Sequence, residues 1–350
     1  MATMPLVSAG RNTLIDIAKS FGPDGKVATV AELLNQSNEI ITYLPFIEGN
    51  LPTGHKGVVR TGLPTVQLRS FYRGVKVSKS GRATIEDVCA LAEGRNEIDK
   101  DLADLNGNTP EFRLSEDSAF FEGMTQQMQG AMLYSNSLST PAQIMGFAPR
   151  YNTLVAATAA TAANVIDMGG TGSTNTSMWV VGWGPQSVFG MFPKAKMAGL
   201  QHEDMGQDVK VLSDGTLMRV YRSHFKWEAG LVVRDWRYIV RLCNIDVTLL
   251  SGGSAANLIN GLVSAFHRMP TAPASTKLNT DPTRPSSPIG ASRFAIYCNR
   301  PVASALDRQA MNKTNLYLNL GQFDGQPVTM FRGIPIRVVD QLLSTEARIV

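Results

Sequence analysis

The sequence predicts an α+β fold, because helical and strand-like periodicities follow one another in separate blocks along the chain. Short helical patterns come first, then a basic stretch with strand-like alternation, then a long helical pattern, and finally mixed strands and helices. The chain has 350 residues, of which 43% are hydrophobic and 18% are charged. These values are typical of a globular protein with one large or two ordinary domains.

The N-terminal segment contains two short helical patterns. The first lies within residues 1–21 and ends at a Gly-Pro-Asp-Gly turn, and the second spans residues 30–38. An apolar segment at 40–47 then leads into the basic stretch. The first residues lack the basic and apolar regions of a signal peptide, and no apolar run approaches the ~18 residues of a membrane span. We therefore expect a soluble protein that is not secreted and has no membrane partner.

Residues 49–85 form a basic stretch with the alternation of a two-stranded arm. Val66 and Leu68 alternate with polar neighbours, and so do Val75 and Val77, which predicts strands around both pairs. The stretch has no acidic residue and seven basic ones: Lys56, Arg60, Arg69, Arg73, Lys76, Lys79 and Arg82. Since two strands alone are not stable in water, the arm needs a partner surface.

An acidic stretch, residues 86–122, follows directly and offers such a surface, in the same subunit or in a neighbour. It contains eleven acidic residues and three basic ones. We predict that the arm's basic residues contact the following side chains: Glu86, Asp87, Glu93, Glu97, Asp99, Asp101, Asp104, Glu111, Glu116 and Asp117. An arm that binds nucleic acid explains the same charges as a competing hypothesis, and the net charge of +4 permits it without requiring it.

The clearest helical period in the chain spans residues 114–136. Phe120, Met124, Met128 and Met132 recur every fourth residue, while Glu and Gln side chains occupy the other side. Ser115 is the predicted N-cap of this helix. A short helix at 96–105 and a turn at 106–110 are predicted to precede it.

The remaining chain predicts strands and helices in mixed order. Asp214-Gly215 is a strong hairpin signal, and the pattern around it predicts a three-stranded meander over residues 207–246. Proline at position 301 suits the first turn of a helix. The other predicted elements are a strand at 178–183, a helix at 258–269, a proline-rich loop at 270–290, a strand at 293–298, a helix from residue 299 and strands within 325–339.

Residues that could support catalysis are few. His202-Glu203-Asp204 lacks the second histidine of a zinc motif, and Ser254 lacks the Gly-x-Ser-x-Gly context of a nucleophile. The glycine-rich segment 169–177 lacks the lysine of a phosphate-binding loop. We expect no enzymatic activity, no cofactor and no metal, with an enzyme that uses Ser254 or His202 as the alternative. The cysteines are predicted to be buried free thiols in a reducing compartment: Cys89, Cys243 and Cys298.

Several short phrases, taken in order, resemble the major capsid protein of tailed double-stranded DNA bacteriophages. This family has the Hong Kong 97-like shell fold, and the similarity is nearest to a short-tailed branch. The phrases are Leu51-Pro52-Thr53, Arg60-Thr61-Gly62-Leu63-Pro64, Phe71-Tyr72-Arg73-Gly74-Val75, VFGMFPK at 188–194 with Ala198-Gly199-Leu200, FKWEAGL at 225–231 and Phe331-Arg332-Gly333-Ile334-Pro335.

The resemblance implies a division of the chain into the parts of a capsid subunit. These are an N-terminal arm at 1–45, an extended β loop at 46–85, a peripheral domain at 86–144 with a spine helix at 114–136, a first axial part at 145–200, long peripheral strands at 201–248, and a second axial part with C-terminal strands at 249–350. We expect the basic loop to lie across a neighbouring subunit's acidic region.

The resemblance also implies function and partners. The chain is expected to assemble with itself into hexamers and pentamers of an icosahedral head around double-stranded DNA, which it meets without sequence specificity. Expected partners are a portal protein and a separate scaffolding protein, and a decoration or cement protein is compatible with the resemblance. The expected location is the virion, after assembly in the cytoplasm of the bacterial host. An encapsulin-like nanocompartment shell of the same fold is the alternative.

Overall fold

A computed structural model describes residues 39–104, 107, 109–212, 215–251, 256–270, 293–312, 318–323 and 326–350. Within these residues the chain forms two compact units, and the predicted mixture of helices and strands is confirmed. The first unit contains residues 91–128 and 199–228, and the second contains residues 39–90, 129–198 and 229–350. The helices predicted at 1–21 and 30–38, the loop at 270–290 and Ser254 lie outside the described residues.

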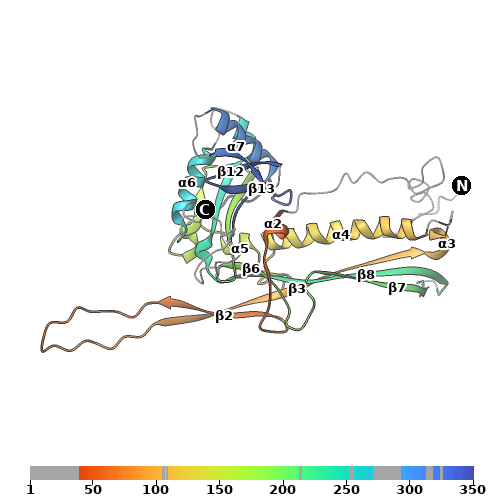
Figure 1. The fold of residues 1–350 in the computed structure, drawn as a ribbon, viewed down its shortest axis with the longest axis horizontal. Coiled ribbons are helices and arrows are strands. Elements are labelled where there is room, and N and C mark those ends of the chain that lie inside the picture. The colour runs from red at the N-terminus through yellow and green to blue at the C-terminus, as the bar shows by residue number, and fades with distance from the viewer. Residues whose placement is uncertain are drawn as a thin grey trace. The chain divides into compact units, whose positions relative to one another are not determined.

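The first unit packs a long helix against a β-hairpin and a further strand. Its elements are the distal half of β3 (Gly81–Asp99), α3 (Lys100–Ala103), most of α4 (Thr109–Tyr134), β7 (Leu200–Val211) and the first part of β8 (Leu217–Val233). β7 and β8 are antiparallel, with Leu200 opposite Trp227 and Val211 opposite Leu217 (Figure 1). The predicted hairpin is therefore confirmed, and Gly215 in its turn has a φ of +82°.

Aromatic and polar contacts fix α4 to these strands. Phe120 stacks on Phe225 with ring centroids 5.2 Å apart, and Phe121 meets the same ring edge-on. The buried Asp117 carboxylate accepts a hydrogen bond from Asn96 Nδ2 at 2.8 Å and another from Ser223 Oγ at 3.1 Å. Since a buried carboxylate requires such partners, Asp117 joins α4 to both β3 and β8.

Helix α4 begins earlier than the sequence pattern predicted. It starts at Thr109 and ends at Tyr134, so the predicted N-cap Ser115 lies inside it. Pro110, which suggested a turn, instead occupies the first helical turn, where a missing N–H costs nothing. The predicted methionine stripe is confirmed, because the side chains of Met124, Met128 and Met132 are buried.

Two other predictions in this region need correction. The short helix predicted at 96–105 is limited to α3, because β3 continues to Asp99 with Asn96 and Ile98 buried on the same face. The three-stranded meander is wrong: β8 continues to Val233, a 3-10 helix η3 (Trp236–Tyr238) follows, and β9 (Ile239–Asp246) pairs with β5 and β4. Strand periodicity does not identify a strand's partner, so the pattern could not exclude this pairing.

The second unit is organised around β5 (Asn175–Trp183), in which every residue is buried. β9 and β10 (Arg293–Cys298) flank it in antiparallel orientation, and β13 (Ile334–Val338) runs parallel to β10. Its other elements are α2 (Glu39–Tyr43), β1 (Phe46–Glu48), β2 (Gly54–Gly62), α5 (Phe147–Arg150), η2 (Ala160–Asn164), β4 (Val165–Asp167), β6 (Val188–Phe192), η4 (Thr248–Ser251), β11 (Leu318–Phe323) and β12 (Gln326–Phe331).

Two helices complete the core of the second unit. These are α6 (Leu258–Arg268) and α7 (Arg300–Asn312), which are labelled in Figure 1. Their apolar side chains pack with those of β5, β9 and β10. The predicted strand at 293–298, the helix at 258–269 and the helix entry with Pro301 in its first turn are confirmed. Cys243 and Cys298 are buried, and burial raises the pKa of each thiol to about 12, whereas Cys89 is only partly buried.

A buried ion pair fastens the C-terminal segment to this core. Arg241 Nη2 on β9 donates to Glu346 Oε2 at 2.7 Å, and its Nε donates to Ser177 Oγ on β5 at 2.9 Å. The Arg241 Nη1 atom donates to the backbone oxygen of Tyr151, and Tyr134 Oη donates to the other Glu346 oxygen at 2.6 Å. Both charged groups therefore have several hydrogen-bond partners, which a buried ion pair requires.

We expect Glu346→Ala to lower the free energy of unfolding by about 3–5 kcal/mol, because it leaves the Arg241 charge buried without its partner. The matched control is Glu86→Ala, which removes an exposed carboxylate 3.9 Å from Lys56 Nζ and should cost less than ~1 kcal/mol. Urea unfolding of the unassembled chain, followed by tryptophan fluorescence, measures both. Equal effects in the two variants would contradict a dominant role for the buried pair.

Candidate subunit interface

Strands β2 and β3 build the predicted basic arm. They are antiparallel from Gly54 opposite Val88 to Gly62 opposite Gly81 (Figure 1). The strands predicted around Val66 and Val75 are not formed, because the ladder ends at the two glycines. Every residue from 63 to 79 is exposed, so no buried face fixes a strand register there.

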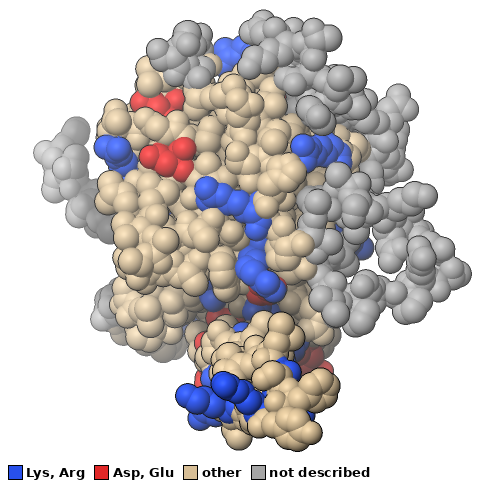
Figure 2. Space-filling model, turned by 90° about the vertical axis from the view of Figure 1, so that its left-hand side faces the viewer, with Lys and Arg blue, Asp and Glu red and all other residues tan. Residues whose placement is uncertain are grey.

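The end of the arm exposes both basic and apolar side chains. All seven predicted basic residues are exposed, and only Lys56 has an ion-pair partner among the described residues. The Phe71 side chain is 90% exposed, and the other exposed apolar side chains beyond the ladder include Leu63, Val66, Leu68, Tyr72 and Val77. Figure 2 faces the end of the arm and shows its Lys and Arg side chains among uncharged ones. An exposed apolar group of this size indicates an interaction surface.

Two of the predicted acidic contact residues are buried within the chain. Asp87 is 5% exposed and pairs with Arg150, whose Nη2 atom lies 2.6 Å from Asp87 Oδ1. Asp117 is buried between α4, β3 and β8, as described above. Neighbouring residues of a strand point to opposite faces, so Glu86 is exposed while Asp87 is buried. The carboxylates of Asp87 and Asp117 are therefore buried and bonded within the chain.

Other acidic residues form ion pairs or contacts within the first unit. Glu97 pairs with Lys210 and with Arg222, whose Nε lies 3.2 Å from Glu97 Oε1. Asp104 pairs with Lys100 at 2.8 Å, and Glu93 lies 3.8 Å from His224 Nε2.

The remaining members of the predicted acidic set differ in exposure. Asp99 is half-buried and caps α3 through the backbone N–H of Asp101, and Glu116 is half-buried. Among the described residues, Asp101 and Glu111 are the exposed members for which the structure gives no ion pair, while Glu86 is exposed beside Lys56. The predicted acidic set therefore contains both exposed and buried side chains, which the sequence pattern did not distinguish.

The residues considered for catalysis are not assembled into a site by the described structure. His202 stacks on Phe225 with ring centroids 4.8 Å apart, and its Nε2 lies 3.6 Å from Asp117 Oδ2. Within the described ranges, no group of three or more His, Cys, Asp and Glu side chains is placed to hold a metal ion. In the same ranges, no helix combines the length and apolar character needed to cross a membrane.

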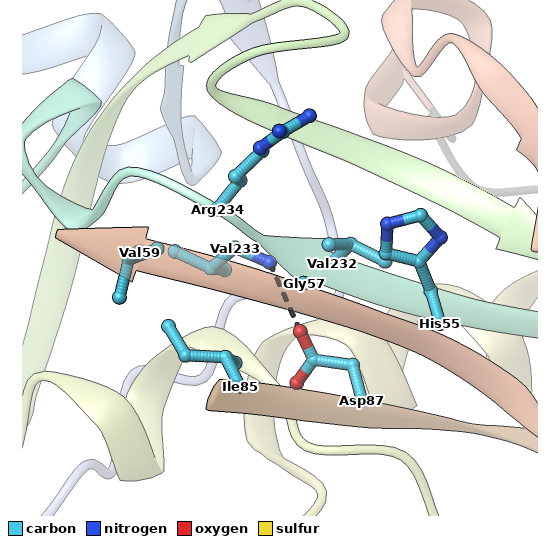
Figure 3. Close-up of a pocket in the computed structure, with 8 residues that line it drawn as sticks. All are labelled: His55, Gly57, Val59, Ile85, Asp87, Val232, Val233 and Arg234. Atoms are coloured by element: carbon cyan, nitrogen blue, oxygen red, sulfur yellow. Dashed lines mark hydrogen bonds between the residues drawn. The ribbon is translucent and has the colours of Figure 1, made fainter. Parts of the chain in front are cut away.

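A small cavity lies at the base of the arm, where β2, β3 and the end of β8 meet (Figure 3). Asp87 Oδ2 accepts a hydrogen bond from the Val233 backbone N–H at 3.4 Å. The cavity is lined by His55, Gly57, Val59, Ile85, Asp87, Val232, Val233 and Arg234. Sequence reasoning missed this site, since Asp87 and Arg150 are 63 positions apart and neither belongs to a motif.

His55 and Gly54 show how closely the strands approach at this base. The His55 ring meets Phe189 edge-on, with centroids 5.5 Å apart. Burial of the ring, and then the nearby charge of Arg234, hold the pKa of His55 below its ordinary value of 6.5. A Cβ atom at Gly54 would lie 2.1 Å from the backbone oxygen of Asp87, so only glycine fits there without movement of the backbone.

Two comparisons identify similar proteins. A family model described as major capsid protein GP7 matches residues 22–350. The solved structure of bacteriophage Epsilon15 is 30% identical, covers 99% of this chain and 99% of that chain, and has a TM-score of 0.76.

More distant structures are also similar in fold. The bacteriophage JBD30 capsid is 10% identical, with 94% of this chain and 99% of that chain covered and a TM-score of 0.43. The SrpI encapsulin of Synechococcus elongatus is 10% identical, with 64% of this chain and 93% of that chain covered and a TM-score of 0.42. No curated protein matches the chain.

We expect Gly54→Ala to lower the free energy of unfolding by about 1–3 kcal/mol, because the new methyl group overlaps backbone atoms of β3. The matched control on the same strand is Gly57→Ala, where a Cβ meets no atom within 4 Å. That variant should be neutral or stabilising by up to ~1 kcal/mol. Urea unfolding measures both values, and equal destabilisation by the two variants would contradict close strand approach at Gly54.

We expect His55→Phe to reduce the loss of thermal stability between about pH 7 and pH 5. Since the pKa of His55 is lowered on folding, the unfolded chain binds the proton first as the pH falls. The stabilising contribution is therefore complete above about pH 6.5 and is lost as the pH falls toward the folded-state pKa. Thermal melts across this range measure it, with His267→Phe as the control at an exposed position. An unchanged pH dependence in His55→Phe would contradict the assignment.

Proposed function

This chain belongs to the major capsid protein GP7 family, and we propose that its arm joins each copy to a neighbouring copy within the shell. The chain is a structural protein of a phage capsid with the predicted Hong Kong 97-like fold. In the proposed assembly, copies form hexamers and pentamers of an icosahedral head that encloses double-stranded DNA. The chain acts in this assembly as a structural subunit and not as a catalyst.

The proposal extends to the parts of the subunit and to its partners. The first compact unit corresponds to the peripheral domain, with α4 as the spine helix, and the second unit carries the axial domain and the arm. A separate scaffolding protein and a portal protein take part in assembly in the host cytoplasm, and a decoration protein is compatible with it. These roles are supported by family membership and by the likeness to the Epsilon15 structure.

The exposed end of the arm is the observation that carries the proposal. The segment 63–79 has no buried residue, although it contains several large apolar side chains. A surface of this kind is stabilised when a second molecule covers it. In a symmetric shell every copy meets an identical neighbour, so each arm finds the same receiving surface.

The charges of the arm direct this contact. Exposed ion pairs contribute only ~0–1 kcal/mol each, so they add little to stability individually. Complementary patches do increase the rate of encounter and fix orientation. The proposed receiving residues in the neighbour are the exposed Glu86, Asp101 and Glu111, with the half-buried Asp99 and Glu116 beside them. Glu93 and Asp104 are exposed too, but they already contact His224 and Lys100 of their own chain.

We expect Arg69→Glu combined with Arg73→Glu to reduce shell assembly at least tenfold at low salt while the fold stays intact. The reversal places negative charge against the neighbour's acidic residues. Sedimentation and electron microscopy measure assembly, and circular dichroism checks the fold. Lys194→Glu with Arg293→Glu makes the same change in net charge at exposed positions outside the arm.

Normal assembly of the double-reversal variant at low salt as well as at moderate salt would show that the pairing idea is wrong. The alternative function of the arm, binding of nucleic acid, makes a different prediction. It requires the unassembled wild-type chain to bind DNA with an affinity that falls as salt rises. Under that alternative, the arm variant would lose DNA affinity and still form shells.

A further inference from the structure

The arm is held at its base by one carboxylate on β3 that contacts two other elements of the second unit. Asp87 lies on β3, six residues after Gly81, whose pair with Gly62 is the last strand pair of the arm. Its Oδ1 atom accepts from Arg150 Nη2 at 2.6 Å, and its Oδ2 atom accepts from the Val233 N–H at 3.4 Å. A single side chain thus joins β3, the end of α5 and the end of β8.

Arg150 is itself held rigidly. It ends α5, and the residues on either side of its turn, Phe147 and Tyr151, are fully buried against Trp179 of β5. The Arg150 guanidinium also donates to the backbone oxygen of Met145, through Nη2 at 3.2 Å. Its position is therefore set by the core of the second unit and not by the arm.

Further contacts at the same level hold the other strand. His55 lies opposite Asp87 in the ladder and packs edge-on against Phe189 of β6. The backbone N–H of Cys89 donates to the oxygen of Thr53 at 2.9 Å. Beyond this level, no residue from 56 to 86 is buried, so the base supplies the contacts that define the arm's direction.

The length of the arm amplifies any change at its base. Tyr72, near the apex, is 15 positions before Asp87, which corresponds to about 50 Å of extended chain at ~3.3 Å per residue. A tilt of about 5° at the base would then move the apex by about 4 Å, which is enough to misplace a side chain on a neighbour.

We propose that Asp87 is a positioning residue for shell assembly, and that its ion pair with Arg150 fixes the direction of the arm. This assignment replaces the intermolecular contact that the sequence suggested for Asp87. It rests on the proposed role of the arm in joining copies. Loss of the ion pair should cause a geometric defect. Without the pair, the arm of a folded subunit samples many directions, and shells form with irregular size.

The direction of the arm can be measured on the unassembled full-length chain. Spin labels on genetically encoded ketone residues at Ser70 and Thr158 leave the native cysteines intact, and both positions are exposed. Pulsed electron paramagnetic resonance gives the distribution of distances between the labels. We expect Asp87→Asn to at least double the width of this distribution relative to the wild type. Glu86→Gln, on the adjacent exposed carboxylate, should leave the width unchanged.

A second variant keeps the test decisive if Asp87→Asn does not fold. Asp87→Asn combined with Arg150→Gln leaves no unpaired buried charge and should show the same broad distribution. A purely structural role would lower the melting temperature and leave the width in folded molecules unchanged. A wild-type width in whichever of these variants folds would overturn the proposal. The proposed contact between the arm and a neighbouring copy is tested separately. Normal assembly of the variant that combines Arg69→Glu with Arg73→Glu would contradict that contact.

Discussion

The exposed arm depends on a buried interaction at one end. A two-stranded ribbon has no core of its own, so its direction is defined only where it is attached. The Asp87–Arg150 pair, with Gly54 allowing close approach of the strands, supplies this attachment. The rest of the second unit contributes by holding α5 against β5. A stiff base and an uncovered end suit a protein whose arm is completed by another copy of itself.

Charges serve two separate purposes in this molecule, and burial decides which. Arg241 and Glu346 are buried with several hydrogen-bond partners, and they join distant segments of the second unit. Lys56 and Glu86 are exposed and 3.9 Å apart, so their interaction is weak. Weak exposed charges are still useful in a shell, because symmetry repeats each contact many times. In the proposed assembly the exposed charges guide the encounter of two copies, while buried pairs such as Arg241–Glu346 join segments within the second unit.

The sequence predicted the order of elements better than their contacts. Local signals such as the methionine stripe of α4, the glycine of the hairpin turn and Pro301 depend on nearby residues, and they were interpreted correctly. The partner of β9 and the orientation of Asp87 depend on residues far along the chain. Glu86 and Asp87 are adjacent and chemically alike, yet one is exposed and the other buried. Only the paired strands show which face each carboxylate occupies.

Zero-length cross-linking of shells assembled from mixed isotopically heavy and light copies tests the central claim most directly. A carbodiimide joins a lysine amine to a carboxylate only when the two are in contact. We predict mixed-isotope peptides that join Lys76 or Lys79 of one copy to the exposed acidic residues of another, such as Asp101 or Glu111. Cross-links from these lysines that occur only within single copies, or only to residues outside 86–122, would contradict the account.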